Sequence, residues 1–280
     1  MVDQTVNPHP VGAASRADVV ANVVVNSEAS RFLREILEKA IANPAGVAPR
    51  WLAETWALLA NILVNDYLNN WNHAGKDDVR KAEEAVLNAL AIDPRLALAH
   101  HANGLIHRAR GQHQAALNAF ERAVEFDPYF ARAQAQLGNE LVLLGRPGDA
   151  TQPLEKVIEL NQHHPAIGYF YWIIGRAYFF DQKYREAIPW LRKSASALPT
   201  VWYNRLYLVS ALAHVGGTDG AEETVEAKTL LKEFLDHSGF GKHTVTRVAS
   251  YEEANPNDHA MVVAGRERFR DGLRKADMAP

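Results

Sequence analysis

Three glycines recur at nearly constant spacing through the middle of the sequence. Gly104 and Gly138 are 34 residues apart, and Gly175 follows 37 residues later. An alanine follows each glycine at one fixed interval, and a large apolar residue follows that alanine about one helical turn later: Ala116, Ala150 and Ala187, then Phe120, Leu154 and Leu191. Because small residues at fixed spacing let neighbouring helices approach closely, this register predicts stacked pairs of helices.

Prolines end the predicted helix pairs. Pro128 and Pro199 stand at the same interval after Gly104 and Gly175, whereas Pro165 stands three positions later in its repeat, which accounts for the longer spacing there. Proline cannot continue a helix, and it biases the residue before it away from helical backbone. The whole pattern resembles the tetratricopeptide repeat, a helix–turn–helix unit of about 34 residues. The resemblance implies an all-α fold, a right-handed superhelical α-solenoid.

The register extends in both directions and predicts about five helix pairs, which make up a repeat array at residues 28–238 together with a capping helix at 28–42. The pairs are expected at about residues 50–94, 95–128, 129–164, 165–199 and 200–238. In the last pair, Gly216 and Gly217 are expected to form the turn. A loop and a second capping helix are expected at 239–280, and residues 1–27 are expected to be a flexible segment.

The composition excludes several classes of protein. The chain of 280 residues has no cysteine, which rules out a disulfide scaffold, cysteine-ligated zinc and thiol catalysis. The 30 Lys and Arg residues against 33 Asp and Glu residues give a net charge of −3, so no nucleic-acid partner is expected. No apolar run is long enough to span a membrane and no secretory signal is recognisable, so we expect no membrane partner and a cytoplasmic location.

Motifs for catalysis and metal binding are absent from the sequence. It has no phosphate-binding loop, no dinucleotide-binding glycine motif and no nucleophile elbow. Adjacent carboxylates such as Glu83 and Glu84 diverge by about 100° on a helix, so they do not converge on a substrate. The 12 histidines include no pair at the i, i+4 spacing of helical zinc sites. We therefore predict that the protein is not an enzyme and holds no metal or cofactor.

The first helix of each pair is expected to line a concave groove. Counting from the repeat starts places ten residues on this face: His101, Arg108, Arg132, Asn139, Tyr169, Trp172, Arg176, Phe179, Tyr203 and Ser210. The arginines, together with Asn139, suit carboxylates because a guanidinium group donates two parallel hydrogen bonds. The aromatic residues would supply apolar pockets. The alternative is that these arginines are solvated or paired within the array.

The end of the chain carries a second resemblance. Residues 268–278, with the sequence RFRDGLRKADM, are similar to the closing motif of a bacterial group. That group comprises the repeat-containing C-terminal halves of class III adenylate and guanylate cyclases and related winged-helix regulators. Trp71, His100 and the segment 171–175 fit the same group, and the similarity extends over residues 28–278. Because no segment shows the alternation of a cyclase sheet, the resemblance implies the repeat module without its catalytic partner.

Two functions follow as hypotheses. The first is a non-enzymatic protein–protein interaction scaffold that binds a partner peptide or protein segment in the concave groove. The alternative is a regulatory or sensor module that acts in trans on a cyclase or a transcription regulator through a small ligand. A homodimer, formed through the uncapped face of the last pair, is a further partner hypothesis; the alternative is that residues 240–278 cover the last repeat or the groove.

Overall fold

The computed structural model describes residues 27–69, 72–199, 201–219, 221–237, 244–251 and 259–280. These ranges contain 13 helices and no strand, as the all-α prediction requires. The predicted flexible segment lies outside the described residues except for Ser27, which begins a helix. Trp71 and parts of the loop predicted after residue 238, at 239–243 and 252–258, also lie outside them.

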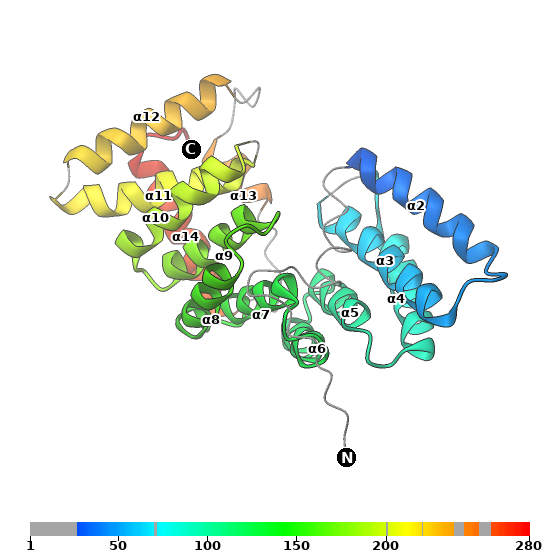
Figure 1. Ribbon diagram of the computed structural model, residues 1–280. Helices are drawn as coiled ribbons and strands as arrows, with labels where there is room; N and C mark the ends of the chain where they lie inside the picture. The colour runs from blue at the N-terminus through cyan, green and yellow to red at the C-terminus, as the bar shows by residue number, and fades with distance from the viewer. Residues whose placement is uncertain (1–26, 70–71, 200, 220, 238–243, 252–258) are drawn as a thin grey trace, which may run out of the picture.

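Ten of the helices form five consecutive pairs, which confirms the predicted solenoid. The pairs are α3 (Pro49–Leu68) with α4 (Lys76–Ile92), α5 (Ala97–Ala109) with α6 (His113–Phe126), α7 (Ala131–Leu143) with α8 (Pro147–Leu160), α9 (Ile167–Phe180) with α10 (Tyr184–Ala197), and α11 (Trp202–Asp219) with α12 (Ala221–His237). Figure 1 shows the pairs following an arc, with α3, α5, α7 and α9 along its inner side. We call the first helices of the pairs, from α3 to α11, the inner layer.

The repeated glycines explain how closely the helices of a pair pack. A Cβ atom added at Gly138 would lie 2.8 Å from the side chain of Leu154, and one added at Gly175 would lie 2.8 Å from that of Leu191. Real side chains do not approach to this distance, so each glycine leaves the space that the apolar residue of the second helix fills. Both leucines are fully buried.

Two details at the C-terminal end differ from the sequence prediction. Gly216 and Gly217 do not form a turn, because α11 continues through them to Asp219. A Cβ atom at Gly216 would lie 2.6 Å from the backbone nitrogen of Thr224, so this glycine serves the close approach of α12. A short helix that the sequence analysis missed, α13 (Val245–Tyr251), buries Val245 and precedes the last helix.

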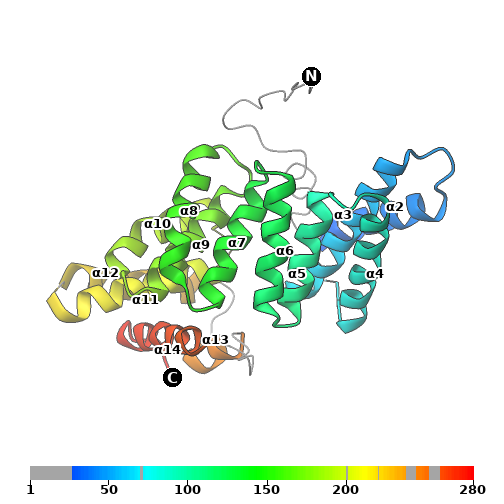
Figure 2. The same cartoon turned by 90° about the horizontal axis from the view of Figure 1, so that it is seen from below.

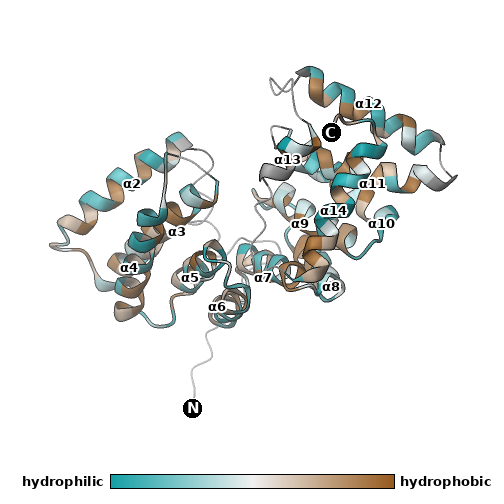
Figure 3. Ribbon diagram, turned by 180° about the vertical axis from the view of Figure 1, so that it is seen from behind, coloured by the Kyte–Doolittle hydropathy of each residue, from teal (hydrophilic) through white to brown (hydrophobic). Residues whose placement is uncertain are grey.

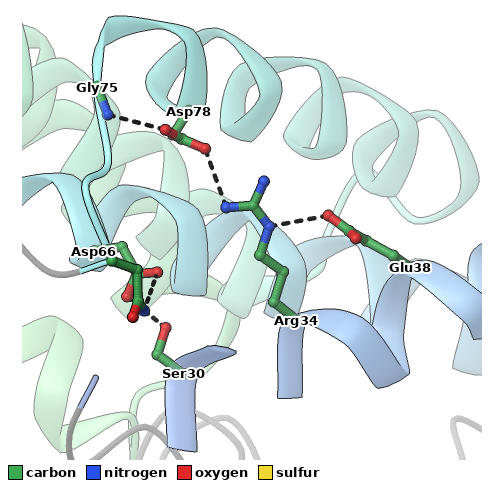
Figure 4. Close-up of polar contacts among 7 residues, drawn as sticks. Ser30, Arg34, Glu38, Asp66, Gly75 and Asp78 are labelled. Atoms are coloured by element: carbon green, nitrogen blue, oxygen red, sulfur yellow. Dashed lines mark hydrogen bonds and ion pairs between the residues drawn. The ribbon is translucent and has the colours of Figure 1, made fainter. Parts of the chain in front are cut away.

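The capping helix α2 (Ser27–Ala42) is attached to the first pair by polar contacts (Figure 4). The fully buried carboxylate of Asp66 accepts hydrogen bonds from the Ser30 hydroxyl and from the Asn72 amide, the latter at 3.0 Å. Arg34 donates to Asp78 at the start of α4 at 3.1 Å. Figure 3 shows α2 and α12, at the two ends of the array, with alternating hydrophilic and hydrophobic residues, which is typical of helices that pack on one side.

Replacing Asp66 by alanine is expected to loosen α2 and lower the free energy of unfolding. The buried Ser30 hydroxyl and the exposed Asn72 amide lose their charged acceptor, and hydrogen bonds to charged groups contribute about 1.5–3 kcal/mol each, so we expect a loss of about 2–4 kcal/mol. Urea denaturation followed by circular dichroism measures it. Asp77→Ala is the matched control, because that side chain is 86% exposed. A loss no larger than that of the control would contradict the anchoring role of Asp66.

The last helix, α14 (Ala260–Lys275), packs against α9 and α11 of the inner layer (Figure 2). Phe269 is buried and stacks on Tyr207, with ring centroids 4.1 Å apart. Gly265 lies against the ring of Phe180, and Gly272 lies against the backbone of Ser210. The C-terminal helix therefore covers part of the face that the sequence analysis assigned to a partner.

Candidate partner-binding site

All ten residues predicted to line the groove lie on inner-layer helices. They come from α5, α7, α9 and α11, as the register of the repeat requires. Their surroundings nevertheless differ, and the structure divides them into residues covered by α14, residues of the packed interior, residues paired within the array, and a cluster of aromatic and cationic side chains.

Two of the ten residues are covered by α14, so with this helix in place they cannot contact a partner. Phe179 is fully buried, and its ring lies 6.5 Å from that of Phe269. Ser210 is also fully buried, and its hydroxyl donates to the backbone carbonyl of Phe269 at 3.0 Å. Counting repeat positions placed both residues in the groove, and the structure covers them with the segment that follows the array.

His101 belongs to the packed interior and not to an open surface. It is 1% exposed, and its ring lies 5.0 Å from that of Phe130. The amide nitrogen of Asn61 donates to two backbone carbonyls, so its oxygen faces His101 and accepts from Nδ1 at 2.8 Å. Burial, reinforced by the charges of Arg132 and Arg108, holds the pKa of His101 well below its ordinary value. The ring is therefore neutral and acts as a structural side chain.

Arg108 is paired within the array, as the alternative interpretation of the arginines proposed. Its Nε donates to the carboxylate of Glu140, which is fully buried and also accepts from His113 at 2.9 Å. Burial on its own would raise the pKa of Glu140, but the charge of Arg108 and the two hydrogen bonds outweigh it, and the pKa lies below the ordinary value. This group joins α5, α6 and α7.

Arg176 has no such carboxylate partner. Its terminal nitrogen donates to the side-chain oxygen of Asn139, which is itself buried, and its Nε has no hydrogen-bond acceptor among the described residues. The guanidinium carbon lies 4.6 Å from the ring centre of Trp172 and 5.8 Å from that of Phe180. Burial lowers the pKa of Arg176, and the nearby Tyr207 and Tyr169 only partly offset this effect. The cation is thus partly buried against aromatic rings with a neutral partner.

Aromatic side chains from α9 and α11 surround this arginine. The ring of Trp172 stacks on Tyr169 at 5.5 Å and lies 4.8 Å from the ring of Tyr203. The indole N–H of Trp172 is buried and has no acceptor in the described part of the chain. Burial and the neighbouring Tyr169 raise the pKa of Tyr203, so the Tyr203 phenol stays protonated and can donate. We call Tyr169, Trp172, Arg176 and Tyr203 the aromatic–arginine cluster.

Residues on α7 complete this surface. Arg132 is partly exposed, and its charge acts on His101. Gln136, which the sequence analysis missed, accepts a long hydrogen bond of 3.4 Å from the Tyr169 hydroxyl. Glu140 was missed as well, although a charged residue directly before the apolar pair Leu141 and Val142 is a readable sign of a buried ion pair.

The described residues contain no group of three or more histidine, aspartate and glutamate side chains that could hold a metal ion. None of the described helices is both long enough and apolar enough to cross a membrane. His100, from the densest histidine group in the sequence, contacts the backbone carbonyl of Pro94 at 2.9 Å.

Comparison with known proteins identifies the repeat. Residues 97–130, which contain α5 and α6, match the family model for the tetratricopeptide repeat. No curated protein sequence matches the chain. The chain and PilW, described as a widely conserved type IV pilus biogenesis factor, superimpose with a TM-score of 0.54 at 17% identity, over 78% of this chain and 90% of that one.

Two further structures are similar at the same level. The pilF protein of Pseudomonas aeruginosa gives a TM-score of 0.51 at 18% identity, over 80% of this chain and 96% of that one. The MamA RS-1 ArsTM double mutant gives 0.51 at 19% identity, over 67% and 98%. At these identities the likeness shows the fold alone, which is that of a tetratricopeptide-repeat solenoid. The similarity to cyclase C-terminal halves and winged-helix regulators is not shown by these matches and stays a prediction.

Proposed function

We propose that this chain is a non-enzymatic interaction scaffold that holds a segment of another protein against α7, α9 and α11 of the inner layer. The observation that carries the proposal is the aromatic–arginine cluster. A partly buried cation without a carboxylate partner and a buried indole N–H without an acceptor are costly in a free protein, and a bound partner relieves that cost. Tryptophan, tyrosine and arginine are also the residues that contribute most at protein interfaces.

The partner is expected to be acidic where it meets this surface. Arg176 adds a positive charge whose hydrogen-bond partner is the neutral Asn139, while the charge of Glu140 is already matched by Arg108. This local balance is opposite in sign to the net charge of −3 of the whole chain. Such a difference favours steering and alignment of a negatively charged segment.

The experiment is a selection of peptides from a random displayed library, followed by affinity measurements on single peptides. The double substitution Trp172→Ala with Arg176→Ala is expected to weaken binding about tenfold or more, because a truncated hot-spot residue costs about 2 kcal/mol. Helicity is expected to be unchanged. The matched control is Leu87→Ala, a 64% exposed residue on α4 in the outer layer. Selected peptides that bind the double variant as well as the native chain would contradict the proposal.

A second candidate is the regulatory module that acts in trans on a cyclase or a transcription regulator. One observation favours it: the donors of the cluster come from α9 and α11, with Gln136 of α7 beside them, so one small ligand could contact three helices. Adding the chain to a class III cyclase that lacks its own repeat half, and measuring cyclic nucleotide production, tests it. An unchanged rate with and without small carboxylates would contradict this candidate.

A further inference from the structure

The aromatic–arginine cluster contains hydrogen-bond donors without an acceptor. Arg176 and Trp172 are four residues apart on α9, so their side chains lie on the same face of the helix. Each has a buried N–H, the Nε of Arg176 and the Nε1 of Trp172, without an acceptor among the described residues. The neighbouring phenol of Tyr203, whose pKa is raised by burial, adds a further donor, whereas the hydroxyl of Tyr169 already donates to Gln136. A ligand that satisfies this set must supply acceptors.

The charge of the cluster limits that ligand to a single negative charge. Arg176 is the one cation of the cluster, and its present hydrogen-bond partner is the neutral amide of Asn139. Arg108 on α5, whose charge also acts on Arg176, already has the carboxylate of Glu140. A phosphate group carries close to two negative charges at neutral pH and would remain half neutralised here.

The guanidinium group favours a planar acceptor. Its carbon lies 4.6 Å from the centre of the Trp172 ring, and a guanidinium edge donates parallel hydrogen bonds in one plane. A carboxylate is planar and accepts two parallel hydrogen bonds from such an edge, whereas a point acceptor would leave one donor unpaired. The aromatic walls exclude water and strengthen the charged hydrogen bonds.

We propose that Arg176, Trp172, Tyr169 and Tyr203 form a recognition subsite for one carboxylate group. The subsite deepens the proposed scaffold function and rests on it for the source of the carboxylate, an acidic side chain of the bound segment. The same chemistry could come from a free chain terminus or a small carboxylic acid, and the experiment distinguishes these sources.

The test follows the indole N–H resonance of Trp172 in protein labelled with ¹⁵N, with the resonance assigned by Trp172→Phe. The probes are acetylated, amidated Ala-Ala-Glu-Ala-Ala and its Gln isostere, acetylated pentaalanine with a free C-terminus, and sodium acetate. The resonance is expected to move downfield with the Glu peptide and to stay in place with the Gln isostere. Movement with the free terminus or with acetate alone supports the subsite and assigns its carboxylate to that source.

Arg176→Met separates recognition from folding. Because a partly buried cation without a countercharge destabilises the free protein, its removal is expected to raise the melting temperature by about 2–4 °C while it abolishes the response to the Glu peptide. Arg192→Met on α10 is the matched control, because Arg192 is 51% exposed and already paired with Glu226. That control is expected to leave the response unchanged.

Several outcomes would overturn the subsite. Equal responses to the Glu and Gln peptides, no response to any probe, or a stronger response to a phosphoserine peptide would each do so. An Arg176→Met variant that melts lower and keeps the response would show a structural role only.

If library peptides bind the inner layer and Glu-to-Gln changes in them have no effect, the subsite fails and the scaffold stands. If acetate shifts Trp172 but no peptide binds, the scaffold fails and the subsite stands.

Discussion

Replacing Glu140 by alanine is expected to lower the free energy of unfolding by about 3–5 kcal/mol, because removal of one partner from a buried ion pair leaves the other charge uncompensated. Glu140 is fully buried, and Arg108, whose side chain is 13% exposed, depends on it for its countercharge. His113 at the start of α6 loses its carboxylate as well. The substitution therefore weakens the contact between the second and third helix pairs at the point where α5, α6 and α7 meet.

The experiment compares three variants by urea denaturation. Glu125→Ala removes an exposed carboxylate from α6 and is expected to change stability by less than about 0.5 kcal/mol. The double variant Arg108→Met with Glu140→Leu is expected to recover most of the loss, because replacing a buried pair by apolar residues of similar size is often neutral. A double variant as unstable as Glu140→Ala would show that packing, and not the stranded charge, sets the cost.

The pH dependence of the same pair follows from the direction of the pKa shift. The pKa of Glu140 lies below its ordinary value of 4.5 in the folded chain. Such a carboxyl group contributes stability that is fully present above the unfolded-state pKa and is lost as the pH falls through the folded-state pKa. The stability difference between the native chain and Glu140→Gln should therefore be constant near neutral pH and shrink as the pH falls below 4.5. A difference that grows under acid conditions would contradict the assignment.

The repeat could be predicted from the sequence because its determinants are local and periodic. Gly138 and Leu154 stand at the fixed offset of the repeat and meet within one helix pair, so their spacing alone implies the contact. The same reasoning placed all ten candidate residues on the inner layer. The prediction of a turn at Gly216 was wrong, because a pair of glycines indicates a turn and a close approach of two helices equally well.

The partners of the arginines could not be predicted in the same way. Asn139 and Glu140 are neighbours on α7, and about 100° of helix rotation separates their side chains. One meets Arg176 of α9 and the other meets Arg108 of α5. The rotation of α7 between α5 and α9 decides which arginine is paired with the carboxylate and which is paired with the amide. That rotation is a property of the packed array and not of any single repeat.

The position of α14 depends on contacts between residues that are distant in the sequence. Ser210 and Phe269 are 59 positions apart, so no periodic register connects them. One sign was readable: Gly265 and Gly272 are seven residues apart and therefore share a face of the helix. Two glycines on one face of an otherwise regular helix indicate that its backbone approaches another element closely.

Gly272→Leu is accordingly expected to detach α14 while leaving the five helix pairs folded. A Cβ atom at position 272 would lie 2.7 Å from the backbone oxygen of Ser210 and 2.8 Å from its Cα atom, and backbone within a packed helix cannot move aside. Overpacking of this kind costs about 1–3 kcal/mol or more, a penalty that the docked helix avoids by leaving the surface. Detachment would also break the hydrogen bond from Ser210 to Phe269.

Hydrogen exchange and limited trypsin digestion measure the detachment. In the variant, amides of α14 should exchange rapidly, and trypsin should cleave at Arg268, Arg270 and Arg274. Amides of α9 and α11 should keep most of their protection, because their contacts with α10 and α12 do not involve α14. Ala264→Leu is the matched control, since residue 264 is exposed on the same helix. If α14 of Gly272→Leu stays protected, the helix has adapted to the clash without leaving the surface, and the prediction is contradicted. The contacts of α14 that bury Phe179 and Ser210 would then be more adaptable than the structure indicates.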